Sequence, residues 1–233
     1  MVLSDRDLHR RLLDFYRSGL STEVGMSFDE CLRQVKVGVL PPALAALIEA
    51  EPGESKIIID PFPDDTHIGS CSVDLHLGVD IWQHLGGASV TQLYGPVRME
   101  HMVDVRAQDV FNQIRTEHQT ISEKQGIVLE PGTFIRATTL QKFFLPHDVM
   151  AEVVGRSTMA RLGIVGVGSP KVDAGFFGSI LLEIPNLGHH KIQLFQGICI
   201  CQIIFHQLSS PAQVPYYRRE QGGRYSGPQG GIG

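Results

Sequence analysis

The stretch EVVGRSTMARLGIVGVGSPKVDAGFFGSILLEIPNLG, residues 152–188, decides the fold. It joins one apolar run, 149–154, to a second one, 180–184, through a connection rich in glycine with one proline. Short β-branched runs that are bounded by turn formers are typical of strands. The stretch therefore predicts two β-strands with a structured connection between them.

Similar runs follow one another along the chain after residue 55. They occur at 56–59, 73–77, 126–129, 134–137, 192–195 and 198–205. Short strands at regular spacing, split by Pro, Gly and Asp turns, predict a mainly β domain with a distorted jelly-roll or barrel arrangement. No internal repeat or linker divides this part, so we expect one β domain over residues 56–217.

Residues 1–55 have a helical pattern instead. Ser4, followed by acidic residues, is a candidate N-cap for a helix that runs to Gly19. A second helix is expected to begin near Ser27, and a third at 43–49, after two prolines. The apolar stripe of the first helix consists of Leu8, Leu12, Leu13 and Phe15.

The last residues, 218–233, form a third region. They contain six glycines, and three arginines against one glutamate. Such a segment cannot build a core, so it is expected to be flexible. Glycine allows close backbone approach and arginine binds phosphate, which favours a tail that closes over an anionic ligand.

Composition narrows the function classes. The net charge of −5 argues against nucleic acid as the main partner. The sequence has no unbroken apolar run of about 18 residues, so it predicts no membrane-spanning helix. The N-terminus carries acidic residues and no apolar signal segment, so we expect a soluble cytoplasmic protein. Reduced and mostly buried thiols are expected at Cys31, Cys71, Cys199 and Cys201, the last two on one face of a strand.

The segment GRSTMARLG, residues 155–163, is a candidate phosphate cradle. Ser157 is expected to cap a short helix, 158–162, that Gly163 ends. The N–H groups of that helix and Arg156 would then face the same ligand. A capped surface turn with two arginines and no ligand is the plain alternative.

Two acids stand out downstream. Asp173 lies in a turn-forming Asp-Ala-Gly sequence, which needs no further role. Glu183 interrupts an apolar run and shares its face with Leu181 and Pro185. An acid isolated among apolar groups has a raised pKa suited to proton transfer, whereas an exposed strand face would explain it without chemistry.

Six segments, in order, resemble the dCTP deaminase family of the dUTPase-like superfamily. They cover residues 1–13 and about 56–230, with residues 14–55 as an atypical insertion. The segments are LSDRDL (3–8), IIIDPFPDDTHIGSCSVDLHLG (57–78), PGTFIRATTLQKFFLPHDVMAEVVGRSTMARLGI (131–164), VDAGFFGSILLEIPN (172–186), GICICQIIF (197–205) and PYYRREQGGRY (215–225). The resemblance implies a dUTPase-like fold.

The resemblance also implies residue roles. Glu183 would be the general base that moves protons between water, cytosine and departing ammonia, and Asp173 would accept the deoxyribose 3′-hydroxyl. The cluster that holds the triphosphate and the attacking water would be Arg156, Ser157, Thr158, Met159, Ala160 and Arg161. The backbone at Leu181 and Leu182 would meet the pyrimidine, and the closing tail residues would be Tyr216, Arg224 and Gln229.

The expected partners are pyrimidine deoxynucleotides of the dCTP, dUTP or dTTP type, and two further copies of the chain in a homotrimer with sites between subunits. Mg²⁺ is expected to accompany the triphosphate. The H-x-E and P-C-x-x-C signatures of zinc deaminases are missing from the sequence, so zinc-independent chemistry is expected, with no protein-held metal.

The main prediction is hydrolytic deamination of dCTP to dUTP and ammonia. Two alternatives keep an enzyme: a bifunctional protein that continues to dUMP and diphosphate, with Asp173 activating water, and a dUTPase alone. A third is a non-catalytic trimeric nucleotide-binding scaffold. The atypical loop 168–171 leaves the base selectivity open.

Overall fold

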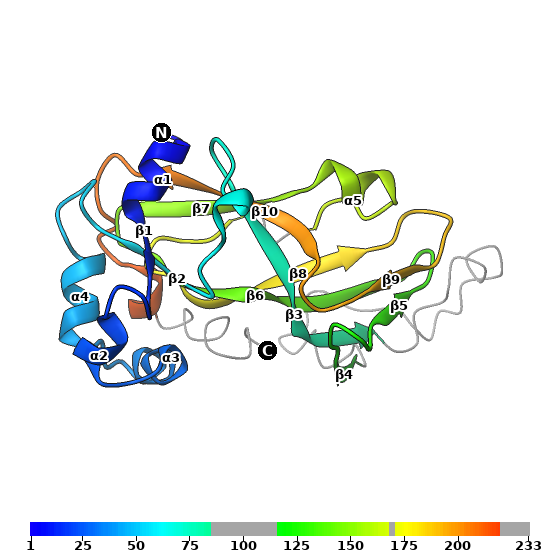
Figure 1. The fold of residues 1–233 in the computed structure, drawn as a ribbon, viewed down its shortest axis with the longest axis horizontal. Coiled ribbons are helices and arrows are strands. Elements are labelled where there is room, and N and C mark those ends of the chain that lie inside the picture. Colours follow the sequence, from blue (N-terminus) through cyan, green and yellow to red (C-terminus); the bar gives the residue numbers. More distant parts are fainter. Residues whose placement is uncertain (85–115, 168–170, 220–233) are drawn as a thin grey trace.

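The computed structural model describes residues 1–84, 116–167 and 171–219. The described chain is mainly β, with its longer helices gathered near the N-terminus, as the sequence predicts (Figure 1). None of its helices is long and apolar enough to cross a lipid bilayer, among the residues that the structure describes.

One large sheet contains most of the strands. Its order is β1-β2-β6-β3-β10-β7, with β4 paired to β3 and β8 paired to β6. The strands are β1 (Leu12–Asp14), β2 (Ile57–Asp60), β3 (Val73–His84), β4 (Thr116–Thr120), β6 (Phe134–Phe144), β7 (Val149–Gly155), β8 (Phe177–Pro185) and β10 (Cys199–Gln207). A separate pair joins β5 (Ile127–Leu129) to β9 (Ile192–Leu194). Each apolar run that the sequence analysis assigns to a strand is confirmed.

The first helix is shorter than its apolar stripe predicts. Ser4 caps α1 (Asp5–Arg11) through a reciprocal capping box with Asp7, as expected from its position. The prediction that the helix runs to Gly19 is wrong, because the chain becomes strand β1 at Leu12 and pairs in parallel with β2. Tertiary pairing thus overrides a helical pattern.

Three more helices follow in the N-terminal segment. They are α2 (Leu20–Val24), α3 (Phe28–Lys36) and α4 (Pro42–Ile48). Ser27 caps α3 and Pro42 opens α4, which confirms both expected starts. Short helical turns elsewhere are η1 (Asp65–His67), α5 (Ser157–Arg161) and η5 (Tyr216–Arg218).

The N-terminal helices pack against one end of the large sheet (Figure 1). Phe28 of α3 lies 5.1 Å from Phe144 of β6, between ring centroids, and Phe177 of β8 stacks on Phe144 from within the sheet. The main core, around residues such as Leu75 and Ile203, lies inside the β part. The segment 14–55 is therefore joined to the β domain through a shared apolar cluster.

A β-bulge separates two cysteines that were expected on one strand face. The register of β10 against β3 shifts between Cys199, opposite His76, and Cys201, opposite Leu75. Cys201 is fully buried and Cys199 only partly, so the same-face prediction is wrong. Of the other thiols, Cys31 is buried, but Cys71 is exposed.

Candidate active site

The connection after β7 places the predicted phosphate cradle at the surface. Arg156, with extended backbone angles, occupies the N-cap position of α5, and no side chain caps the helix. The prediction that Ser157 caps it is wrong, because the helix begins one residue earlier, at Ser157 itself. Met159 and Gly163 are half-buried, whereas the remaining predicted side chains are exposed: Ser157, Thr158, Ala160 and Arg161.

Within the described chain, Arg156 is the one predicted cradle residue that forms an ion pair with the sheet. Its Nη1 donates to Asp74 Oδ2 at 3.1 Å, and Asp74 Oδ1 accepts from Gln202 Nε2 at 2.8 Å. Asp74 is nearly buried on β3, so both contacts form in a partly desolvated place where hydrogen bonds to charges are strong. The sheet therefore fixes the direction of the Arg156 side chain.

Two glycines hold the far end of α5 in place. Gly163 has φ +94°, and a Cβ built on it would lie 2.3 Å from the backbone nitrogen of Gly188. Leu187 N also donates to Gly163 O at 2.8 Å. Because the two backbones touch, only glycine fits, and α5 is anchored against the connection that follows β8.

A pocket of about 260 Å³ lies on the β8 side of the molecule. It is lined by Lys171, Val172, Asp173, Phe176, Ile180, Leu181, Glu183 and Tyr216. Four of these residues are among the predicted site residues: Asp173, Leu181, Glu183 and Tyr216. The fold thus brings together residues that are more than 40 positions apart, with both acids and an aromatic ring at one hollow.

The Asp-Ala-Gly turn builds one wall of this pocket. Val172 pairs with Ala151 of β7 through two backbone hydrogen bonds of 2.9 and 2.7 Å. Gly175, at φ +77°, then lets the chain turn, and Tyr216 N donates to Ala174 O at 2.8 Å. The turn therefore fixes the segment of Tyr216 directly beside Asp173.

Two cations contact the Asp173 carboxylate. Lys171 Nζ lies 2.9 Å from Oδ1, and Arg219 Nη1 donates to Oδ2 at 3.5 Å. Neither cation is among the residues that the sequence predicts for the site. Lys171 could have been found, because residues two apart in extended chain point the same way. Arg219 follows Tyr216 by only three positions, which was the available signal.

Glu183 lies at the exposed side of the pocket, facing an arginine on the neighbouring strand. Its side chain is exposed in this chain, and its register partner on β6 is Arg136. The prediction of an acid isolated among apolar groups is therefore wrong. The pattern of β6 gave the signal, since Arg136 interrupts an apolar run as Glu183 does.

Arg136 is the more desolvated member of this pair. Burial lowers the pKa of Arg136, and the charge of Glu183 opposes that shift. Among the described residues no hydrogen-bond partner reaches Arg136 Nε, which is buried. A half-buried guanidinium therefore lies opposite the Glu183 carboxylate across β6 and β8.

The remaining predicted residues divide into three groups. Leu181 lines the pocket, but Leu182 is fully buried in the core on the other face of β8. Arg224 and Gln229 lie outside the described residues.

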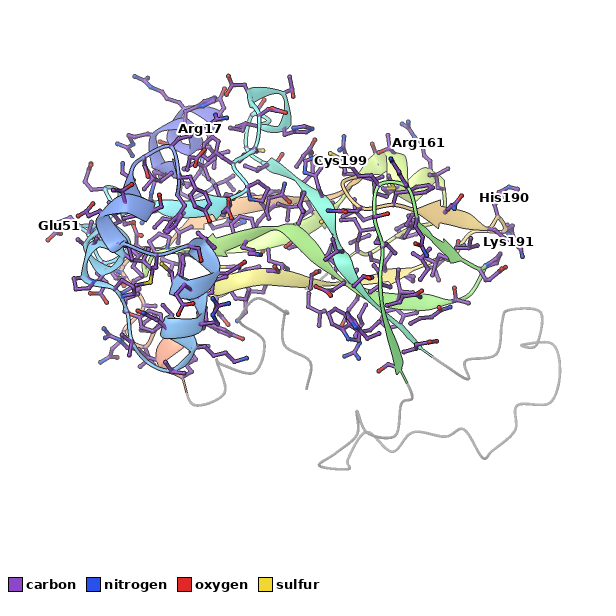
Figure 2. All side chains as sticks on the ribbon, turned by 60° about the horizontal axis from the view of Figure 1, so that its bottom comes forward. Arg17, Glu51, Arg161, His190, Lys191 and Cys199 are labelled. Atoms are coloured by element: carbon purple, nitrogen blue, oxygen red, sulfur yellow. The ribbon has the colours of Figure 1, made fainter. Side chains whose placement is uncertain are left out.

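None of residues 156–161 lines the pocket, and Figure 2 shows Arg161 toward the end of the molecule that carries His190, away from Glu51. The single chain therefore presents the pocket and the α5 cluster as separate groups.

Comparison with known proteins identifies the family. The family model described as dCTP deaminase-like matches residues 43–208. A "dCTP deaminase, dUMP-forming" of Methanosphaera stadtmanae is 35% identical over 76% of this chain and 84% of its own. A "dCTP deaminase" of Thermomicrobium roseum is 33% identical over 74% and 82%. A crystal structure of 2′-deoxycytidine 5′-triphosphate deaminase from Agrobacterium tumefaciens aligns with a TM-score of 0.46 and 22% identity, over 64% of this chain and 41% of that one. With more than half of its residues matched by the family model, this chain belongs to the dCTP deaminase-like family.

Proposed function

We propose that this protein deaminates dCTP and then hydrolyses the product to dUMP and diphosphate. The observation that carries the proposal is the pocket that joins Asp173 and Glu183. The relatives from Methanosphaera stadtmanae and Methanobrevibacter smithii are both named dUMP-forming, which favours the bifunctional alternative over release of dUTP.

The pocket suits a pyrimidine nucleotide in shape and charge. Phe176, Ile180 and Leu181 offer an apolar surface for a flat base, and Tyr216 lies 5.5 Å from Phe176 between ring centroids. In the proposal the Asp173 carboxylate accepts a hydrogen bond from the 3′-hydroxyl of the sugar. The two cations beside it, Lys171 and Arg219, attract the phosphates.

Glu183 would act as the general base of the deamination. A water molecule gives one proton to the carboxylate while its oxygen bonds to C4 of cytosine, and Glu183 passes that proton to N3. Glu183 then takes the second proton from the C4 hydroxyl and gives it to the amino group, the C4–N bond breaks, and ammonia leaves as the C4 carbonyl forms. The sum is dCTP and water to dUTP and ammonia, and Arg136 lies opposite Glu183 on the neighbouring strand.

The second reaction would use the opposite wall of the pocket. Asp173 activates a water molecule that attacks the α-phosphorus, and diphosphate leaves. Mg²⁺ would be held by the phosphate oxygens of the nucleotide, because oxygen atoms are its preferred ligands. The Asp173 carboxylate is already paired with Lys171, so it is not assigned as a ligand of the ion. When bound, Mg²⁺ neutralises the charge of the phosphates.

The complete site is proposed to form between copies of the chain in a homotrimer. Glu183 is exposed and the α5 cluster does not reach the pocket of its own chain. A neighbouring copy that places its α5 over the pocket would shield Glu183 and add cations for the phosphates. Light scattering on the purified protein measures the molar mass, and a monomer at assay concentration would contradict this arrangement. The cytoplasmic location remains a prediction.

Incubation with dCTP and Mg²⁺, with ammonia and diphosphate measured separately, tests the reaction. Both products in equal amounts support the proposal. Ammonia alone would mean a deaminase that releases dUTP, and diphosphate from dUTP but not from dCTP would mean a dUTPase. Absence of both products with both nucleotides would overturn the enzyme assignment and favour the scaffold.

A further inference from the structure

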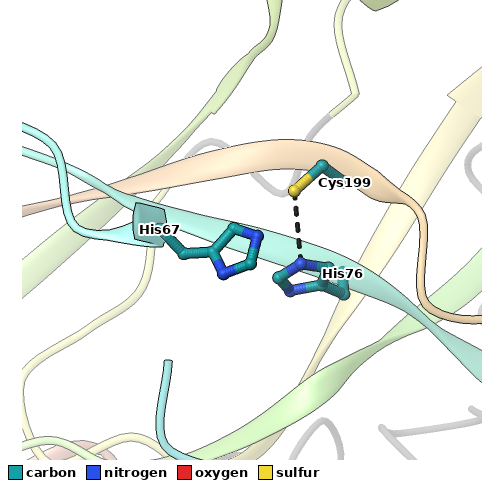
Figure 3. A group of neighbouring side chains, drawn as sticks. All are labelled: His67, His76 and Cys199. Carbon is teal, nitrogen blue, oxygen red and sulfur yellow. Dashed lines mark hydrogen bonds between the residues drawn. The ribbon is translucent and has the colours of Figure 1, made fainter. Parts of the chain in front are cut away.

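Three side chains with metal-ligating atoms meet outside the pocket. His67 of η1, His76 of β3 and Cys199 of β10 each offer one ligand atom, and all three atoms lie within 4.8 Å of one another. Figure 3 shows the two imidazoles and the thiol converging from these separate elements. All three residues are half-buried, so the cluster is formed by the fold and remains accessible to a small ion.

The β-bulge in β10 creates this arrangement. Cys199 and Cys201 would share a face in a regular strand, and Cys201 is fully buried in the core. The register shift turns Cys199 to the other face, opposite His76. Bulges commonly re-aim a side chain next to a site, and here the re-aimed side chain is a thiol beside an imidazole.

The second nitrogen of each imidazole has an outer contact. Asp64 Oδ2 lies 3.7 Å from His67 Nδ1, and the Gln141 amide nitrogen Nε2 lies 2.7 Å from His76 Nδ1, while Gln141 Oε1 accepts from His76 N at 3.0 Å. This leaves the Nε2 atoms for the cluster, and His76 Nε2 lies 3.2 Å from Cys199 Sγ. Metal-binding histidines usually have such an outer partner on the other nitrogen, because it fixes the ring.

We propose that His67, His76 and Cys199 bind one Zn²⁺ ion per chain. Tetrahedral zinc with sulfur at about 2.3 Å and nitrogen at about 2.0 Å holds these ligand atoms about 3.5 Å apart. The Cys199–His76 distance of 3.2 Å is close to that value. His67, on a short surface turn, has to approach by no more than about 1.3 Å, because all three atoms lie within 4.8 Å of one another.

The donor set selects the metal. A thiolate with two imidazoles suits zinc, whereas magnesium and calcium take oxygen ligands. On binding, the Cys199 thiol gives its proton to solvent and the thiolate coordinates the ion, so one proton is released for each zinc bound. His76 then carries its proton on Nδ1, so the Gln141 side chain has to reorient and give up the bond that its Oε1 accepts from the backbone N of His76. Water fills the fourth position.

A thiol–imidazole hydrogen bond is the competing explanation. With the Gln141 amide group donating to Nδ1, His76 would carry its proton on Nε2 and donate to Cys199 Sγ. That bond accounts for two residues, and an edge-to-face ring contact with 4.6 Å between centroids accounts for His67 beside His76. It also predicts no metal uptake, so the two explanations differ in a direct measurement.

The zinc site is distinct from the proposed reaction. Cys199 Sγ lies 3.6 Å from Asp74 Oδ2, and Asp74 pairs with Arg156. None of the three ligands lines the pocket with Asp173 and Glu183. Zinc at this site would brace the Asp74 side of the sheet and would not activate the water for deamination.

The proposal is tested on the full chain after a chelator has removed any bound metal. Calorimetry follows the titration with Zn²⁺, and metal analysis after gel filtration gives the number of ions that stay bound. We expect one ion per chain and release of one proton. Co²⁺ as a probe should give a sulfur-to-cobalt charge-transfer band. No stoichiometric uptake, or a cobalt spectrum without the sulfur band, would overturn the assignment.

Cys199→Ser and His67→Asn should each weaken zinc binding at least about tenfold, since each removes one of three ligands. Cys71→Ser is the matched control, because Cys71 is an exposed thiol outside the cluster and should leave affinity unchanged. His67 lies in a surface turn, so its variant reports on binding even where Cys199→Ser folds poorly. Unchanged affinity in His67→Asn, or a loss in Cys71→Ser, would contradict the site.

Discussion

Asp148 and Glu183 are both acids next to apolar strands, and their surroundings are opposite. Asp148 is 1% exposed and Arg11, equally buried, donates to it at 2.9 and 3.1 Å. Gly53 N and Gln207 Nε2 add further hydrogen bonds of 2.9 Å each. Glu183 is exposed at the edge of a pocket, with Arg136 opposite.

The comparison shows how a protein uses a carboxylate in two ways. Burial alone would raise the pKa of Asp148, but hydrogen bonds from Ser55, Gln207 and Gly53, and the charge of Arg11, lower it instead. An acid that is so fully engaged can hold segments together but cannot take up a proton during a reaction. Glu183 has room beside it, which a proton-transfer role requires.

Asp148→Asn should have the largest effect on stability. It leaves the buried Arg11 guanidinium without its counter-charge, so we expect the free energy of unfolding to fall by about 3–5 kcal/mol. Urea unfolding followed by circular dichroism measures the change. Asp64→Asn, at an exposed acid, is the control and should change stability by less than about 0.5 kcal/mol. A loss of less than about 1 kcal/mol in the free energy of unfolding of Asp148→Asn would contradict the structural role of Asp148.

Glu183→Gln should lower activity and leave stability nearly unchanged. The amide keeps the shape but cannot accept the proton, so we expect turnover of dCTP to fall at least about 100-fold. The free energy of unfolding should change by less than about 1 kcal/mol, because the side chain is exposed. Steady-state ammonia release and nucleotide binding by calorimetry separate the two effects. Near-normal turnover would remove Glu183 as the base.

Acid should destabilise the wild type through Asp148. The native state holds the pKa of this carboxyl below the ordinary 3.8, so the unfolded chain takes up the proton first as the pH falls. The stabilisation is present above pH 4 and is lost as the pH falls through the lowered native value. Urea midpoints measured from pH 6 to pH 3 should therefore fall more steeply in wild type than in Asp148→Asn. Parallel curves would exclude this contribution.

Removal of all residues after Tyr217 should have only a small effect on stability. It deletes exposed pairs such as Arg219 with Asp173, which contribute less than about 1 kcal/mol each, so the melting temperature should drop by less than about 4 °C. Loss of the arginines should weaken dCTP binding about tenfold or more. A large drop in melting temperature with unchanged affinity would instead make the tail structural.

Sequence patterns predicted the strands that carry their own apolar runs. They missed β4, whose sequence TEHQT is polar and which is held by pairing with β3. They also missed β1, because its leucines continue the apolar stripe of α1. Both strands depend on a partner far along the chain, and local periodicity contains no information about that partner.

The candidate site was predicted in part for the same reason. Motif order singled out Asp173, Glu183 and Tyr216, and the structure places these three residues at one pocket. The register of β6 and β8 sets the exposure of Glu183 and places Arg136 opposite it. The pair of Asp173 and Arg219 forms because the C-terminal part of the described chain comes back to the Asp-Ala-Gly turn. The bulge that redirects Cys199 has no local signature, so the cluster with His67 was not expected.

Gly175 sets the spacing between the two walls of the pocket. A Cβ on this residue would lie 2.5 Å from Pro215 Cβ and 3.0 Å from Tyr216 N. One added methyl group would therefore push the segment that carries Asp173 away from the segment that carries Tyr216. A relative that has lost only this glycine would retain every reactive group and still be inactive, so a survey that inspects acids alone would count it as a working enzyme.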